Sequence, residues 1–253
     1  MPPTKPETVK EFTFTKGDFE RVRALIYQRA GISLADSKQE MVYSRLARRL
    51  RATGIGSFTR YLDDLEAGHL GEEWQSFTNA LTTNLTSFFR EAHHFPLLAE
   101  HVKKLRDKPI TIWCSASSTG EEPYSIAMTV CEAFNTLTPP VQIIATDIDT
   151  NVLSVGANGV YALDRIGKLE PARLKKFFLR GKGAQEGMVR VRPELRNLVT
   201  FRQLNLLADG WQLNNQFDVI FCRNVMIYFD KATQRKILAR FVPLMKPDAL
   251  LFA

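Results

Sequence analysis

The chain has 253 residues, of which 45% are hydrophobic and 24% are charged, an ordinary composition for a globular protein with one large or two modest domains. The sequence shows no secretory signal and no apolar run long enough to cross a bilayer. Its three cysteines lack metal-type spacing, so we expect a soluble intracellular protein in a reducing compartment. A net charge of +7 favours an acidic partner, whether nucleic acid, an anionic membrane or an acidic protein.

The first eighty or so residues have a helical pattern. After a loose tail over 1–14, Thr15 and Asp18 resemble a capping box, and apolar residues at helical spacing run from Phe19 to a stop at Gly31. The same spacing predicts three more helices, over Asp36–Arg51, Phe58–Ala67 and Glu72–Leu81. We therefore expect an all-α domain over 15–83.

The second predicted helix is strongly basic. Arg45, Arg48 and Arg49 are three and four residues apart, so they stack on one face, and Lys38 lies seven residues before Arg45 and joins them. Arg51 adds a further charge nearby. A solvated charged face is the simpler interpretation. The alternative is docking onto an acidic surface, which would steer encounter and weaken with salt.

From Ile110 the pattern changes to strands alternating with helices. Ile110–Trp113 reads as a buried strand, Cys114–Gly120 as a loop of small residues, and the following acids, proline and apolar-periodic segment as a helix. In an open α/β sheet a nucleotide-like ligand lies beyond the carboxyl ends of the strands, at such a loop. An ordinary loop without a ligand is the alternative.

Polar residues follow two further predicted strands. Asp147 ends Val141–Thr146, where an acid commonly accepts hydrogen bonds from the ribose hydroxyls of a nucleoside, and Asp149 is placed to cap the next helix. The strand Phe217–Cys222 is followed by a polar set that we expect at the same edge of the sheet: Arg223, Asn224 and Tyr228.

Between these strands, residues 165–198 break the alternation. They contain a helical piece at Pro171–Phe178 and a strand at Met188–Arg192, which predicts a small β-rich insertion. Insertions on a rigid scaffold often carry recognition, although a decorative hairpin is the simpler interpretation. Because the last strand, Ala249–Ala253, ends without a turn, we expect the chain as given to be shortened at its C-terminal end.

The sequence lacks the motifs of several common enzyme classes. There is no Gly-x-Ser-x-Gly, no His-Glu-x-x-His and no Walker phosphate loop, and a loop with one glycine disfavours a dinucleotide. S-adenosylmethionine, a nucleoside without phosphates, needs fewer glycines. His93, His94 and His101 lie on or near one helix, where solvated side chains are a better interpretation than a metal site, and we expect no metal.

Four motifs occur in a fixed order along the chain, at Asn84–Glu91, Ser118–Ser125, Ala145–Asp149 and Phe221–Asp230. Together they resemble the chemotaxis receptor methyltransferase family, CheR, over about Asp18–Ala253. The resemblance implies an α/β S-adenosylmethionine-dependent methyltransferase domain, Rossmann-like, over 84–253. A small antiparallel β-subdomain would be inserted at about 165–198, and an all-α N-terminal domain would come first. It also implies methyl transfer to glutamate carboxylates of chemoreceptors, giving glutamate methyl esters and S-adenosylhomocysteine in sensory adaptation.

The same resemblance assigns roles to individual positions. The cofactor would contact Asn84, Thr86, Arg90, Glu122, Asp147, Asn205, Leu206, Arg223 and Asn224. Arg90 and Tyr228 would be catalytic, nearest the transferred methyl group. The basic residues Lys38, Arg45, Arg48, Arg49 and Arg51 would dock on the receptor's cytoplasmic helical bundle, and Gly181, Gly187 and Arg190 would hold its C-terminal pentapeptide. The expected protein is a cytoplasmic monomer recruited to membrane-bound receptor arrays, without nucleic acid or membrane insertion.

Two other functions fit parts of the pattern. A nucleic-acid methyltransferase would share the fold and a basic surface, but adenine-N6 enzymes carry Asn/Asp-Pro-Pro-Tyr/Phe where Asn224 is here followed by Val-Met-Ile-Tyr. A non-catalytic receptor-binding adaptor would keep the fold without turnover. A nicotinamide dehydrogenase would need the glycine fingerprint that the chain lacks.

Overall fold

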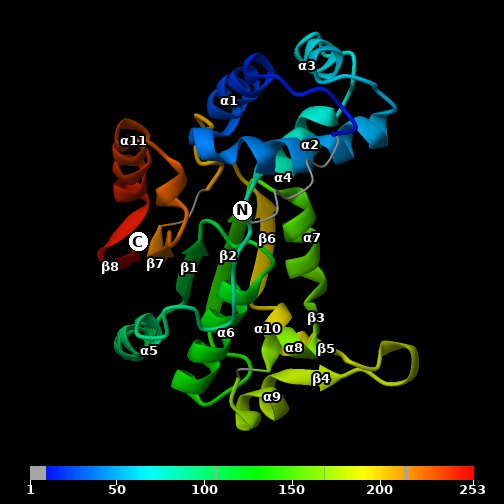
Figure 1. Ribbon diagram of the computed structural model, residues 1–253. Helices are drawn as coiled ribbons and strands as arrows, with labels where there is room; N and C mark the ends of the chain where they lie inside the picture. Colours follow the sequence, from blue (N-terminus) through cyan, green and yellow to red (C-terminus); the bar gives the residue numbers. More distant parts are fainter. Residues whose placement is uncertain (1–9, 106, 168, 214–215) are drawn as a thin grey trace, which may run out of the picture. The chain divides into compact units, whose positions relative to one another are not determined.

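The computed structural model describes residues 10–105, 107–167, 169–213 and 216–253, so most of the predicted tail at 1–14 lies outside the described residues. The chain divides into two compact units, Met1–Thr82 and Thr83–Ala253 (Figure 1). No helix among the described residues is long and apolar enough to span a membrane. Each unit is described by itself.

The first unit is helical. Its elements are α1 Lys16–Ala30, the 3-10 turn η1 Asp36–Lys38, α2 Gln39–Thr53, α3 Phe58–Glu66 and α4 Glu73–Leu81. The predicted capping box is confirmed, because the Thr15 hydroxyl accepts from Asp18 N at 3.1 Å and the Asp18 carboxylate accepts from Thr15 N at 2.9 Å. Gly31 ends α1 in the left-handed region, as predicted. The basic helix begins at Gln39 rather than at the predicted Asp36, so Lys38 is the last residue of η1, directly before the helix that carries Arg45.

A buried polar group lies between α2, α3 and α4. Glu73 is 7% exposed and receives two hydrogen bonds from the Arg49 guanidinium, at 2.9 and 2.7 Å. The Tyr61 hydroxyl donates to the same carboxylate at 2.7 Å. Burial raises the pKa of Tyr61, and the hydrogen bonds that Arg49 donates to Glu73 raise the pKa of Arg49. Arg49 therefore stabilises the helical unit from within.

The second unit is built on a five-stranded sheet with the order β6-β2-β1-β7-β8. Its strands are β1 Ile110–Cys114, β2 Val141–Asp147, β6 Val199–Gln203, β7 Phe217–Phe221 and β8 Met245–Phe252. Every neighbouring pair is parallel. The order runs in opposite directions on the two sides of β1, so the loop after β1 lies at the point where ligands bind in doubly wound sheets.

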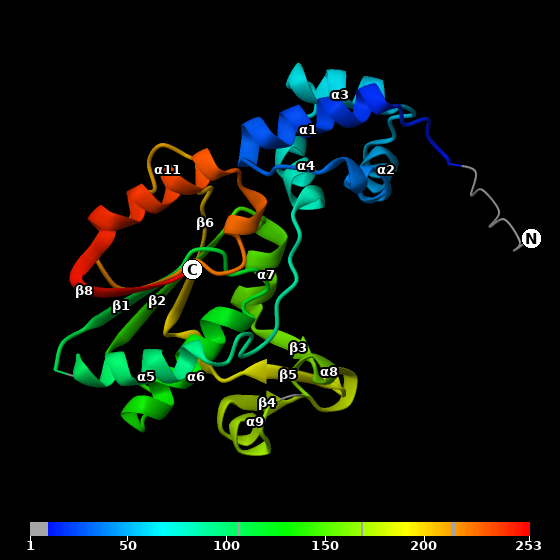
Figure 2. The same cartoon turned by 60° about the vertical axis from the view of Figure 1, so that its left-hand side comes forward.

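The two faces of this sheet are covered by different helices. Ile112 and Cys114 point into one core with α5 His94–Lys104 and α6 Glu121–Phe134. Trp113 points into the other core with Ile237 and Phe241 of α11 Lys231–Phe241. Figure 2 shows α5 and α6 on one side of the strands and α11 on the other. This alternation is the period of two that a buried strand requires.

The insertion forms a second, antiparallel sheet of three strands with the order β3-β5-β4. It contains β3 Val160–Ala162, α8 Leu163–Ile166, α9 Pro171–Phe177, β4 Phe178–Arg180, η2 Gly183–Gln185, β5 Met188–Val191 and α10 Pro193–Arg196. It follows α7 Thr150–Asn158 directly, and both views place it beside α6 at the far end of α7 (Figures 1 and 2). The sheet thus begins at Val160, before the predicted start near residue 165.

Two shorter elements complete the C-terminal part, η3 Met226–Tyr228 and η4 Val242–Leu244. The last strand, β8, begins at Met245 rather than at the predicted Ala249. Pro247 lies inside it, which a strand tolerates at the edge of a sheet because the missing N–H faces away from a partner.

Candidate functional site

The loop after β1 connects the carboxyl ends of three strands. Ser115 N donates to Phe221 O of β7 at 2.8 Å, and Ser117 N donates to Thr146 O of β2 at 2.8 Å. These bonds hold the loop across the edge of the sheet, where the predicted nucleoside ligand would lie.

Asp147 and Asp149 lie in different surroundings, and the predicted capping role of Asp149 is confirmed. Asp149 caps α7 by accepting from Asn151 N and Val152 N. Asp147 is 9% exposed and accepts from Ser118 N at 2.8 Å and from Asp149 N at 3.0 Å. Burial raises the pKa of Asp147 to about 6. An ionised carboxylate has about four acceptor sites, so Asp147 can accept from a ribose hydroxyl in addition to these backbone N–H groups.

The segment from Thr83 to Glu91 runs beside these residues. Asn84 Nδ2 donates to Asp149 Oδ2 at 2.8 Å, which fixes the start of the segment to the cap of α7. Phe89 N donates to Ser125 Oγ of α6 at 2.9 Å, and Arg90 Nη1 donates to Leu85 O at 2.6 Å. The segment therefore bends back on itself and holds the Arg90 guanidinium close to its own backbone.

Arg223 lies at the centre of a buried charged cluster. Its side chain is 1% exposed, and its Nε lies 3.2 Å from Glu122 Oε2 and 3.6 Å from Glu91 Oε2. Its Nη2 donates to Arg90 O. Burial raises the pKa of Glu122, which Arg223 opposes. Cys114 Sγ also contacts Glu122, at 3.2 Å. Arg223 thus ties the end of β7 to the Arg90 segment and to the start of α6.

Asn224 and Tyr228 also hold that segment. Asn224 has a left-handed φ of 56° and donates from Nδ2 to Glu91 Oε1 at 3.0 Å, and this bond lowers the pKa of Glu91. The Tyr228 hydroxyl lies 3.4 Å from Thr83 O. Arg223, Asn224 and Tyr228 therefore all contact the segment Thr83–Glu91, which carries Arg90. Glu91 was missed among the predicted site residues, although its place in the first motif, next to Arg90, was a usable signal.

Asn205 and Leu206 follow β6. Asn205 Oδ1 accepts from Leu207 N at 2.9 Å, which makes a local turn, and Leu206 is buried at 6% exposure. Arg240 of α11 fixes this turn by donating to Leu206 O at 3.3 Å and to Ala208 O at 2.6 Å. The predicted ligand Thr86 is half-buried.

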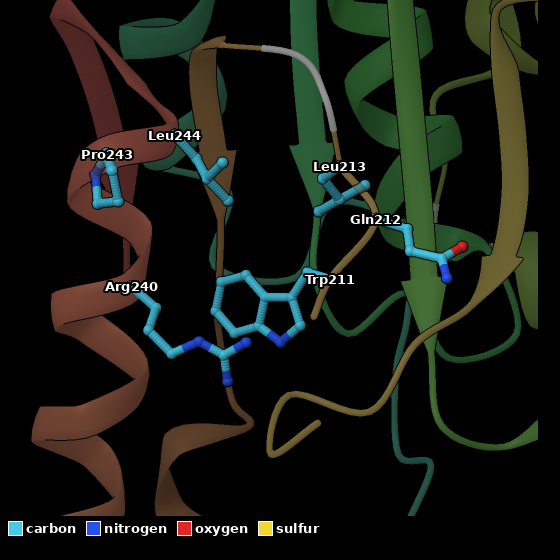
Figure 3. Close-up of a pocket in the computed structure, with 6 residues that line it drawn as sticks. All are labelled: Trp211, Gln212, Leu213, Arg240, Pro243 and Leu244. Carbon is cyan, nitrogen blue, oxygen red and sulfur yellow. The ribbon is translucent and has the colours of Figure 1, made fainter. Parts of the chain in front are cut away.

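A cavity of about 280 Å³ lies behind this turn. It is lined by Trp211, Gln212, Leu213, Arg240, Pro243 and Leu244. Figure 3 shows Arg240 reaching from α11 toward the Trp211 ring, 4.0 Å from its centroid. None of these residues belongs to the predicted cofactor set, although Arg240 bonds the backbone of Leu206, which does.

The predicted docking residues of the first unit differ in how they are used. Arg49 is bound to Glu73, and Arg45 donates to Ala80 O and Thr82 O. These two guanidinium groups hold α4 and its C-terminal end. Lys38 and Arg48 are exposed, and Arg51 is exposed and ion-paired with Glu11 at 2.8 Å.

In the small sheet, Gly181 has no room for a side chain, because a Cβ there would lie 2.0 Å from Gln185 O. Gly187 has a left-handed φ of 81° in open space, and Arg190 is exposed on the central strand β5. Among the residues that the structure describes, no group of three or more His, Cys, Asp or Glu side chains is arranged to hold a metal ion.

The residues present fit S-adenosylmethionine. Asp147 places a carboxylate at the end of β2, where a ribose would lie, and Arg90 and Arg223 are cations that a ligand's carboxylate would contact. Within the described chain, Arg223 Nη1 is buried without a hydrogen-bond partner, a donor that a ligand's acceptor would satisfy. A doubly wound parallel sheet is the class of fold that binds nucleotide-like ligands at this edge, and an acid at the end of β2 is placed for a ribose.

The comparisons with known proteins agree. A family profile described as "CheR methyltransferase, SAM binding domain" matches residues 84–253, and "CheR methyltransferase, all-alpha domain" matches residues 17–82. The chain belongs to the CheR methyltransferase family. This confirms the predicted fold class, the methyltransferase activity and the cofactor S-adenosylmethionine.

Relatives match over nearly the whole chain. The chemotaxis protein methyltransferase of Salmonella typhimurium is 54% identical over 247 residues, covering 98% of this chain and 85% of that protein. Its Escherichia coli counterpart is 53% identical over 247 residues, with 98% and 86% covered. Chemotaxis protein methyltransferase 2 of Pseudomonas aeruginosa is 52% identical over 258 residues, with 100% and 91% covered.

Proposed function

We propose that this chain methylates glutamate side chains of chemoreceptors, giving glutamate methyl esters in the adaptation step of bacterial chemotaxis. The observation that carries the proposal is the set of Arg90, Glu122, Asp147 and Arg223 at one edge of the sheet. That set combines an acid for a ribose with one buried cation, Arg223, and one half-buried cation, Arg90, for carboxylates, in a family of methyltransferases.

The chain's own residues hold and orient the reactants. When bound, S-adenosylmethionine supplies a methyl group on a cationic sulfur, and its transfer to a carboxylate oxygen leaves a glutamate methyl ester and S-adenosylhomocysteine. Asp147 would hold the ribose, and Glu122 with Arg223 would receive the charged methionine end. Arg90 orients a carboxylate by a charge-assisted contact, and Tyr228 closes the same end of the site through the Thr83 backbone.

No general base is needed for this reaction. A glutamate with a pKa near 4.3 is already ionised at neutral pH, so the attacking oxygen is free. The protein's contribution is in-line placement and the exclusion of water. The segment bearing Arg90 is held at both ends, by Asp149 and by Arg223, as such placement requires.

Receptor recognition is assigned to two surfaces. We assign the first contact with an acidic receptor helix to the exposed Lys38, Arg48 and Arg51, whereas Arg45 and Arg49 act within the helical unit. Exposed Arg190 and the glycine-bounded hairpin of the small sheet are assigned to the receptor's C-terminal pentapeptide. We further propose that the protein acts as a monomer, recruited to receptor arrays on the cytoplasmic side.

The test uses receptor-containing membranes and S-adenosylmethionine labelled in its methyl group. Label should appear on the receptor, and a receptor whose methyl-accepting glutamates are replaced by alanine should take none. Labelled DNA with an unlabelled receptor would support a nucleic-acid methyltransferase. Binding of receptor and cofactor without transfer would support an adaptor.

A further inference from the structure

The loop after β1 is also held from the side of the small inserted sheet. At Gly120 the backbone has a left-handed φ of 97°, and a Cβ there would lie 2.8 Å from the Tyr161 hydroxyl and 2.9 Å from Gly156 Cα. Only glycine lets the backbone pass this close to both groups. The loop therefore runs directly under Tyr161, the middle residue of β3.

Tyr161 makes a specific contact there. Its hydroxyl donates to Thr119 O at 2.8 Å, and the residue is 4% exposed. Its ring is held by an edge-to-face contact with Phe88, with ring centroids 5.2 Å apart, and by the pairing of β3 with β5. The hydroxyl is thus presented to the loop in one orientation.

Arg165 of α8 provides the second contact. It forms an ion pair with Glu121, the first residue of α6, whose side chain is 0% exposed. The Thr119 hydroxyl donates to the other oxygen of that carboxylate at 2.6 Å. A fully buried carboxylate needs such partners, because an unpaired charge in that position is strongly unfavourable. Glu121 therefore makes the start of α6 dependent on Arg165.

The opposite side of the same loop carries the candidate cofactor contacts. Ser118 N donates to Asp147 Oδ2 at 2.8 Å, and Ser118 Oγ donates to Asn84 O at 3.2 Å. Only Thr119 and Gly120 separate these bonds from Glu121. A displacement of the loop on the side of the small sheet would therefore move the N–H group that orients Asp147.

We propose that Tyr161 and Arg165 are positioning residues for the cofactor site, which fix Ser118–Glu121 in the conformation that aligns Asp147 and Asn84 with the nucleoside. The small sheet is then a structural part of the cofactor site as well as a surface for partners. This inference rests on the proposed function, since the nucleoside in question is that of S-adenosylmethionine.

The test measures S-adenosylhomocysteine binding by calorimetry in Tyr161→Phe, Arg165→Met and Arg165→Lys. Tyr161→Phe removes one hydrogen bond and should raise Kd about fivefold, whereas Arg165→Met should raise it about tenfold or more because Glu121 loses its cation. Arg165→Lys keeps the charge and should recover part of the affinity. Arg180→Met, at an exposed arginine of β4, is the matched control and should leave Kd unchanged.

Hydrogen exchange in the ligand-free protein provides a second readout. The amides of 118–121 should exchange faster in Tyr161→Phe and Arg165→Met, with no change in Arg180→Met. Unchanged Kd and unchanged exchange in both variants would overturn the inference, as would an equal loss in Arg180→Met. If the unmodified protein does not bind S-adenosylhomocysteine, the proposed function fails, and the exchange measurement still decides whether Tyr161 and Arg165 hold the loop.

Discussion

We expect Asp147 to make cofactor binding sensitive to acid. Burial raises the pKa of this carboxyl to about 6, so it is ionised at pH 8 and protonated at pH 5. The ionised carboxylate accepts hydrogen bonds from the ribose hydroxyls. The protonated carboxyl carries an O–H donor that faces other donors, so it binds the ribose less well. Binding should therefore weaken as pH falls through 6, and a carboxyl that is about one-tenth ionised at pH 5 predicts a Kd about tenfold higher than at pH 8.

The assay is calorimetric titration with S-adenosylhomocysteine from pH 8 to pH 5, on the unmodified protein and on Asp147→Asn. Asp147→Asn should bind more weakly at pH 8, and Asp147 should no longer contribute to the pH dependence. Glu122 also has a pKa raised by burial, so Glu122→Gln is the control that keeps Asp147 intact and should retain a tenfold change. A flat profile in the unmodified protein, or the same profile in Asp147→Asn, would refute the reasoning.

The free energy of unfolding should depend on the protonation of Asp147 in the opposite direction to cofactor binding. A carboxyl whose pKa is raised from 3.8 to about 6 in the folded state stabilises the ligand-free protein at low pH, and this contribution is lost as pH rises through 6. Because one pKa unit corresponds to about 1.4 kcal/mol, this group contributes about 3 kcal/mol to the free energy of unfolding at low pH. Urea unfolding of the ligand-free protein between pH 4 and pH 7 should show it as a difference from Asp147→Asn.

Four further changes have expected outcomes. Arg90→Ala should lower methyl transfer at least about 100-fold, measured as kcat/KM with saturating cofactor, and near-normal turnover would remove Arg90 from the site. Glu73→Ala should destabilise the protein by about 3 kcal/mol in urea unfolding, whereas the exposed neighbour change Glu72→Ala should cost little, and equal effects would contradict the buried-pair argument. Asp149→Ala should cost about 1–2 kcal/mol through the lost cap of α7, with stability as the readout; an unchanged midpoint would count against it. Arg48→Glu should raise KM for the receptor most at low salt, and a salt-independent effect would exclude electrostatic docking.

The sequence was most informative where one short segment determines its own structure. The capping box at Thr15, the cap of α7 by Asp149 and the loop ending at Gly120 were all predicted, because each depends on neighbours within a few residues. The position of Asp147 at the end of β2 was also predicted, from the buried strand that precedes it. Asp147, Asp149 and the Gly120 loop all belong to the second unit, at the carboxyl end of the sheet.

Other features depend on residues far apart in the chain, which periodicity does not reveal. The pairing of Arg49 with Glu73 is one, and it changes a predicted docking residue into a structural one. The strand β3 is only three residues long, too short for alternation to be recognised, so the start of the small sheet was not found. The contacts of Tyr161 and Arg165 with the loop depend on that strand and stayed hidden for the same reason.

The proposed acceptor of the methyl group is a glutamate carboxylate on a receptor. The most direct measurement treats the labelled receptor with alkali after transfer and collects volatile methanol, which carboxyl methyl esters release and N-methyl products do not. Alkali should release labelled methanol, and this release should disappear when the receptor glutamates are replaced by alanine. Label that stays on the receptor through alkali, or methanol release that persists without those glutamates, would contradict it.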